Sequence, residues 1–166
     1  GMGVLVPAGV VHAIDAGVLV VEVQEPTDWS ILIERWITTA SESESHLGIG
    51  FDLALQAVSM AQLDAAALGA LQRTTTSFSG ASLLPPDADP FFRMTGLSAG
   101  DAHGAGFAVV LITEGAGALE SVAYGSVNVS RGEAYAIPHA WGSWTVVGDA
   151  HVIACAPGIG WPATLG

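Results

Sequence analysis

The residues near the start of the chain with the clearest chemical potential are a histidine and a glutamate ten positions apart. His12 lies in the turn-rich segment PAGVVHAIDAG, and Glu22 lies in the run VLVVEVQ that follows it. Zinc and similar metals bind neutral imidazole and carboxylate, and a bound metal polarises a carbonyl so that a carboxylate base can remove a neighbouring proton. The alternatives are that His12 is an ordinary packed histidine and that Glu22 is tied to backbone donors.

Alternation along residues 18–24 predicts which side chains share a face with Glu22. In an extended strand Glu22 and Gln24 lie on the face that carries Val18 and Val20. Two polar groups then interrupt an otherwise apolar face, so Glu22 and Gln24 are candidates for facing a pocket, Gln24 as a substrate contact.

A second candidate group lies in GEAYAIPHAWGSW, residues 132–144. His139 and Trp141, beside Trp144, could form a platform for a sugar, since aromatic faces suit the apolar side of a pyranose ring. The alternative is packing in the core or at its rim. The remaining histidines are expected to be structural or solvated: His46 and His103 in glycine-flanked surface loops, and His151 at the start of a strand.

Three regions of the chain must position these residues. Residues 4–37 read as short strands between turns, residues 38–83 as a linker with one or two helices between Asp52 and Arg73, and residues 84–157 as a series of short apolar segments between glycine turns. Residues 158–166 form a tail. The pattern predicts a mainly β protein with a helical segment inserted between two β regions.

The net charge of the chain limits the classes of partner that it can bind. The formal net charge is −12, lysine is absent, and the four cations are Arg35, Arg73, Arg93 and Arg131. Such a surface repels nucleic acid and anionic membranes. No segment reaches the roughly 18 apolar residues of a membrane span. The single cysteine, Cys155, allows no internal disulfide, so we expect it to be packed in the interior of a cytoplasmic protein.

The segment from Pro7 to His12 fits the P-x-G-x-x-H core of the second cupin motif, and VPAGVVHAIDAGVLVVEVQEPTD resembles the corresponding stretch of class I mannose-6-phosphate isomerases. HLGIGFDLALQAV and LLPPDADPFFR are similar to segments that join the two cupin barrels in bacterial members. The resemblance implies cupin-like jelly-roll strands, His12 as a ligand of zinc or another divalent metal, Glu22 in the active site, and isomerisation of a sugar phosphate through an enediol.

The chain departs from the pattern of this family in two ways, and both affect the function that we expect. The family's other metal ligands lie upstream of the P-x-G-x-x-H motif, and Leu32 stands where bacterial members commonly have an arginine; Arg35 falls on the opposite strand face. We therefore expect an isomerase-like chain that is incomplete or inactive alone, and either zinc or another divalent metal at His12 or no metal at all. The alternatives are a non-catalytic cupin-like module that binds a sugar or regulates, and a related enzyme that assembles its ligands between subunits. Unpaired strands in residues 4–37 also predict a homodimer.

Overall fold

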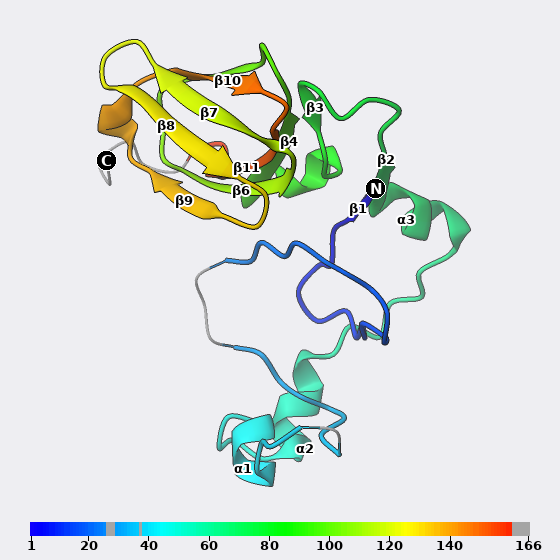
Figure 1. Cartoon of the computed structure of the whole chain (residues 1–166). Helices are drawn as coiled ribbons and strands as arrows, with labels where there is room; N and C mark the ends of the chain where they lie inside the picture. The colour runs from blue at the N-terminus through cyan, green and yellow to red at the C-terminus, as the bar shows by residue number, and fades with distance from the viewer. Residues whose placement is uncertain (26–28, 37, 161–166) are drawn as a thin grey trace. The chain divides into compact units, whose positions relative to one another are not determined.

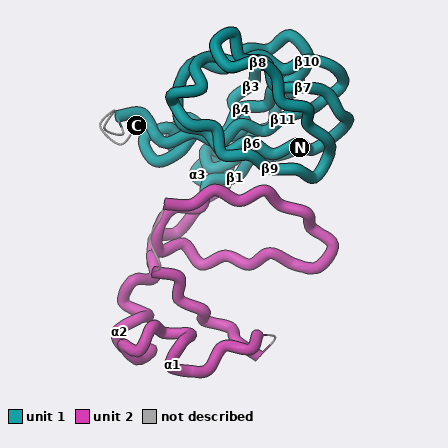
Figure 2. The backbone as a smooth tube through the Cα atoms, turned by 60° about the vertical axis from the view of Figure 1, so that its left-hand side comes forward, with its two compact units in different colours: residues 1–5, 65–166 teal, residues 6–64 magenta. Residues whose placement is uncertain are grey.

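The computed structural model describes residues 1–25, 29–36 and 38–160 of the chain. The chain forms two compact units, the first from residues 1–5 and 65–166 and the second from residues 6–64 (Figure 2). No helix among the described residues is long and apolar enough to cross a membrane.

Unit 1 is built from eleven strands and three short helical turns among its described residues (Figure 1). The strands are β1 (Met2–Val4), β2 (Gln72–Thr74), β3 (Ala81–Ser82), β4 (Phe92–Leu97), β5 (Ala102–His103), β6 (Ala108–Glu114), β7 (Ala116–Ser121), β8 (Gly125–Ser130), β9 (Ala134–Ile137), β10 (Trp144–Gly148) and β11 (His151–Pro157). The helical turns are α3 (Ala65–Ala70), η2 (Pro86–Ala88) and η3 (His139–Trp141).

Two antiparallel sheets face each other in this unit. One has the order β5-β10-β7-β8 and the other the order β3-β4-β11-β6-β9, while β1 and β2 form a separate pair. Strands that are far apart in sequence are neighbours in both larger sheets, which is the connectivity of a jelly roll. The predicted mainly β fold with jelly-roll strands is confirmed, and each apolar segment predicted between residues 91 and 157 contains one of the strands β4 and β6–β11.

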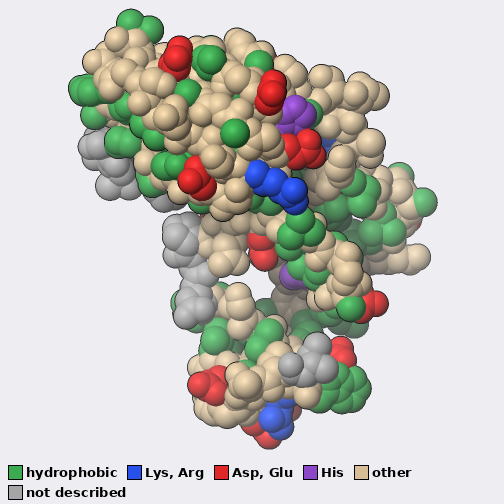
Figure 3. Space-filling model, viewed as in Figure 1, with side chains coloured by type: hydrophobic (Ala, Val, Ile, Leu, Met, Phe, Trp, Pro, Cys, Tyr) green, Lys and Arg blue, Asp and Glu red, His purple; other side chains and the backbone are tan. Residues whose placement is uncertain are grey.

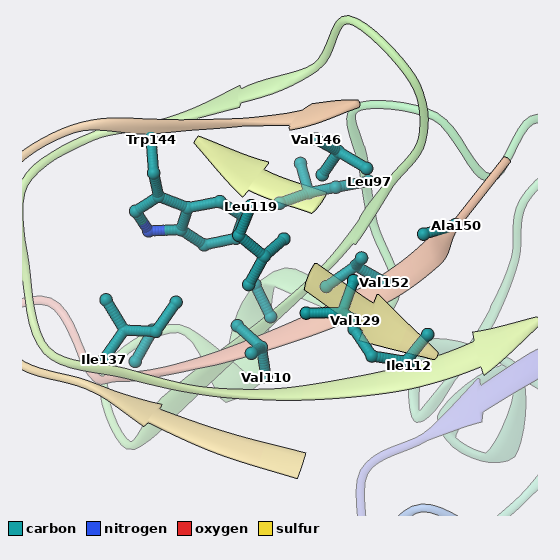
Figure 4. Packing of buried hydrophobic residues seen from close by; sticks show 12 residues of the cluster. Leu97, Val110, Ile112, Leu119, Val129, Ile137, Trp144, Val146, Ala150 and Val152 are labelled. Carbon is teal, nitrogen blue, oxygen red and sulfur yellow. The ribbon is translucent and has the colours of Figure 1, made fainter. Parts of the chain in front are cut away.

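The core lies between these two sheets and follows from strand alternation. Trp144 and Val146 of β10 are buried while Val147 is exposed, and β6 alternates in the same way with Val110 and Ile112 inward. Figure 4 shows these side chains converging from the two sheets with Ile137 and Val152. Burial of this many aliphatic and aromatic groups is the main stabilising contribution to unit 1.

Close backbone approach requires glycine where β7 meets β10. Gly117 lies opposite Gly148 in the ladder, and a Cβ on Gly117 would lie 2.0 Å from the carbonyl oxygen of Val147. Any larger residue at this position would push the two strands of the sheet apart.

Unit 2 contains α1 (Glu42–Ser45), α2 (Phe51–Ala54) and η1 (Leu55–Ala57). A capping box starts α1, because the Ser41 side chain accepts from the Glu44 N–H while the Glu44 carboxylate accepts from the Ser41 N–H. Ser45 is fully buried, and its carbonyl accepts a hydrogen bond of 2.8 Å from the Leu32 N–H.

The helical prediction between Asp52 and Arg73 is confirmed by α2, η1 and α3. The strand prediction is wrong for most of residues 4–37. Beyond β1 this stretch has no strand in its described residues 5–25 and 29–36, since no neighbouring segment pairs with it there. Residues 26–28 and 37, and residues 161–166 of the predicted tail, lie outside the described residues.

Candidate functional site

His12 is held at the surface of unit 2 by a local turn. The Val10 N–H donates to the Pro7 carbonyl at 3.1 Å, and the Ser59 N–H donates to the Gly9 carbonyl at 2.8 Å. The His12 Nδ1 lies 3.0 Å from the Val10 carbonyl oxygen. Because a carbonyl can only accept, Nδ1 is the donor in this contact, and Nε2 is the ring nitrogen left for another partner.

Glu22 and Gln24 are exposed in an extended segment of the same unit. No hydrogen bond or ion pair joins either of them to His12 in the part of the chain that the structure describes. The resemblance implies zinc, which usually takes three or four protein ligands. Among residues 1–25, 29–36 and 38–160, no three His, Cys, Asp or Glu side chains are grouped to hold a metal ion. The described residues therefore do not fit a zinc site.

His139 and Trp141 share one turn of unit 1, the 3-10 helix η3 that follows β9. The Trp141 N–H donates to the Pro138 carbonyl at 3.0 Å, and the Ser121 hydroxyl donates to the Trp141 carbonyl at 2.6 Å. Trp141 is half-buried and packs against the core, whereas His139 is exposed. The structure thus brings these two predicted contacts together at the rim of the barrel, and Gln24 belongs to the other unit.

Two histidines expected in solvated loops are instead packed, which corrects the sequence prediction. His103 stacks on Trp144 with ring centroids 5.1 Å apart, and His46 accepts from the Gly50 N–H at 3.1 Å while its ring meets Phe51 edge-on. His151 begins β11 as predicted and stacks on Phe78. No local pattern could have revealed the contact between His103 and Trp144, since the two residues lie on different strands far apart in sequence.

Trp144 is a core residue rather than part of a sugar platform. Its side chain is buried between the two sheets, and its indole Nε1 has no hydrogen-bond partner among the described residues. In Figure 4 the indole lies among the labelled aliphatic side chains, with Ile137 and Val110 nearby. The interior of the barrel is therefore filled by side chains.

Two surface cavities are lined by other residues than those predicted. One, of about 790 Å³, lies in unit 2 between Ser30 and Gly48 and includes Glu44. Hydrogen bonds from Ser41 lower the pKa of Glu44, so this carboxyl stays ionised. The other, of about 450 Å³, lies in unit 1 and contains Arg73 with four hydroxyl side chains. The run RTTTS, residues 73–77, is the sequence signal that could have identified the second cavity.

No family model matches the sequence, and no curated protein matches it. Among solved structures, a mutant of phosphomannose isomerase from Salmonella typhimurium is similar over 65% of this chain and 27% of its own, at 16% identity and a TM-score of 0.50. Mannose 6-phosphate isomerase from Bacillus subtilis is similar over 69% and 36%, at 15% identity and a TM-score of 0.44. An RmlC-like cupin protein from Desulfovibrio desulfuricans is similar over 42% and 76%, at 20% identity and a TM-score of 0.33.

The chain spans about a quarter of the length of the Salmonella isomerase and about a third of that of the Bacillus isomerase. At 16% identity the likeness to the Salmonella enzyme concerns the fold alone. The two facing antiparallel sheets, their order and this likeness lead to one conclusion: the chain is a mainly β protein with the jelly-roll fold of the cupin proteins.

Proposed function

We propose that this chain is a cupin-fold part of a mannose-6-phosphate isomerase-like protein, and that it does not isomerise sugar phosphates by itself. The observation that carries the proposal is the fold, which is similar to that of a phosphomannose isomerase over 65% of this chain. The interior of the unit 1 barrel is filled by apolar side chains. The P-x-G-x-x-H motif ending at His12 supports the same family.

Isomerisation of an aldose to a ketose moves a proton between two neighbouring carbons, which requires a positioned base and a polarised carbonyl. Glu22 is the carboxylate that the resemblance offers as the base. It is exposed, and no described hydrogen bond holds it against a polarising group. A base that is free to rotate in water gains little from proximity, because catalysis of this kind depends on a fixed geometry.

A coupled assay with mannose 6-phosphate tests the proposal. The purified chain with added zinc is expected to stay at the background rate, and a complete isomerase provides the positive control. Turnover that a chelator abolishes would contradict the proposed lack of isomerase activity. It would show that His12 and Glu22 complete a site.

The rim of the barrel favours a second candidate function, a non-catalytic carbohydrate-binding module. Trp141 is half-buried on the core and exposed His139 precedes it in the same turn, so a ring face and a hydrogen-bonding group are adjacent. Titration with unphosphorylated mannose, followed by tryptophan fluorescence, is expected to saturate if this function is correct and to weaken in His139→Ala. A flat titration would exclude it.

A further inference from the structure

We infer that the unit 1 cavity around Arg73 binds a tetrahedral oxyanion, and that its ligand class is the phosphate monoester. The cavity of about 450 Å³ is lined by Gln72, Arg73, Thr74, Thr75, Thr76, Ser77 and Ala81. All but Ala81 carry a polar side chain that can donate a hydrogen bond. This inference does not depend on the proposed function, because it concerns the recognition of an anion and not the fate of a sugar.

The fold places Arg73 on the side of β2 that faces the segment before β4. Arg73 lies directly opposite Gly3 in the β1–β2 ladder, and cross-strand partners project from the same face. That face is turned towards residue 83, since a Cβ on Gly3 would lie 1.8 Å from the Leu83 carbonyl oxygen. The chain then continues through residues 75–77 to β3, whose first residue, Ala81, also lines the cavity.

The charge of Arg73 is not neutralised by a carboxylate. Arg73 is half-buried and forms no ion pair with any residue that the structure describes, whereas Arg35 pairs with Glu42 at 3.1 Å. No Asp or Glu occurs between Asp64 and Asp87 in the sequence. A half-buried guanidinium without a carboxylate partner retains its full attraction for an external anion.

The carboxylate that Ser79 contacts is already occupied by hydrogen bonds. Asp101 accepts hydrogen bonds from the Ser79 hydroxyl and from the Ser98 N–H. These bonds lower the pKa of Asp101. Asp101 therefore orders the loop without competing for the guanidinium.

The hydroxyl groups identify the ligand class. Thr74 follows Arg73 in β2 and projects from the opposite face of the strand. The side chains of Thr75, Thr76 and Ser77 make no hydrogen bond with another described residue, so each keeps its O–H available to a ligand. A planar carboxylate offers two oxygens, and the guanidinium fork alone satisfies them. A phosphate offers further oxygens in other directions, and the surrounding hydroxyls match these.

Titration calorimetry with inorganic phosphate at constant ionic strength tests the inference. We expect saturable binding with one site per chain. Arg73→Gln is expected to raise the Kd at least about tenfold, the effect of losing one charge-assisted pair of hydrogen bonds. Arg131→Gln is the matched control, since Arg131 is an exposed arginine in the turn after β8 of the same unit. It removes the same charge and should change the Kd less than about twofold.

A second variant covers the case in which Arg73→Gln fails to fold. Thr75→Val keeps the shape of a half-buried side chain and removes its hydroxyl, so it should weaken phosphate binding about threefold to tenfold while leaving the melting temperature nearly unchanged. The inference is overturned if the wild-type chain shows no saturable binding, if acetate binds as well as phosphate, or if both arginine variants lose binding equally. The last result would indicate attraction to charge in general.

Discussion

Burial controls the reactivity of Cys155, the single thiol of the chain. It lies in β11 between Met94 of β4 and Val109 of β6, its register partners on either side. Loss of solvation disfavours the thiolate and raises the pKa of Cys155 from 9.0 to about 11. The group is therefore a neutral thiol throughout the physiological range.

This pKa predicts slow labelling by a disulfide reagent. At pH 8 the thiolate fraction of Cys155 is about 100-fold lower than that of an exposed cysteine, and the rate should rise about tenfold per pH unit until the pH approaches 11. The measurement compares the folded chain with the chain in denaturant. Equal rates in the two states at pH 8 would show that the thiol is accessible and its pKa ordinary.

His12 is a surface residue in this structure, and its substitution should have a small effect. His12→Ala removes the contact to the Val10 carbonyl, and surface changes of this kind usually alter stability by less than about 0.5 kcal/mol. Because His12 belongs to no group of three ligand side chains among the described residues, adding zinc should not change this difference. Melting curves of both proteins with and without zinc provide the measurement. One tightly held zinc per chain that disappears in the variant would refute the prediction.

At the scale of elements, alternation decides which positions of a strand matter. Val146 and Val147 are adjacent in β10, yet the first is fully buried and the second is 40% exposed. Val146→Ala should therefore cost about 2 to 3 kcal/mol, from lost burial and the cavity left behind, while Val147→Ala should cost less than about 0.5 kcal/mol. Chemical denaturation of the two variants measures the difference. Similar losses would mean that the register of β10 is not as described.

The same alternation explains what the sequence could and could not predict. From β4 to β11 each apolar segment has a neighbour that pairs with it, so the local pattern and the sheet agree. Residues 18–24 show a comparable pattern but pair with no strand in the part of the chain that the structure describes, and an extended segment without a partner is not stable as a strand. The local pattern of apolar residues indicates whether a segment can form a strand. Whether a neighbouring strand is available to pair with it depends on the whole molecule.

The candidate site residues divide in the same way, into residues whose surroundings come from nearby sequence and residues whose surroundings come from distant segments. The shared turn of His139 and Trp141 was predictable because the two residues are close in sequence. The roles of His103 and Arg73 depend on Trp144 and on β1, which come from distant parts of the chain. The absence of Asp and Glu between Asp64 and Asp87 excludes a carboxylate partner for Arg73 from nearby sequence only, and the lack of one among the other described residues required the fold.

At the scale of the whole molecule, exposed apolar surface predicts self-association. In unit 2 the run from Val18 to Val21 is exposed, with Leu19 at 96%, and Figure 3 shows many apolar side chains on the face that it displays. Contiguous apolar patches of this kind promote association. We expect a homodimer in light scattering, and Leu19→Glu should shift it towards monomer. A monomer at all concentrations would refute the prediction.

The pairing of β1 with β2 has a consequence for how the chain tolerates changes in length. The Leu5 N–H donates to the Leu71 carbonyl at 2.8 Å, so unit 1 holds the chain on both sides of residues 6–64. Closing a shorter loop costs less entropy, and replacing these residues with a linker about one tenth as long should stabilise unit 1 by about 2 kcal/mol. Thermal unfolding of the shortened chain measures this gain, and a lower melting temperature would contradict it. Residues 6–64 thus lie between the two strands of the separate β1–β2 pair, where a segment can be lengthened, shortened or exchanged while the two larger sheets keep their register.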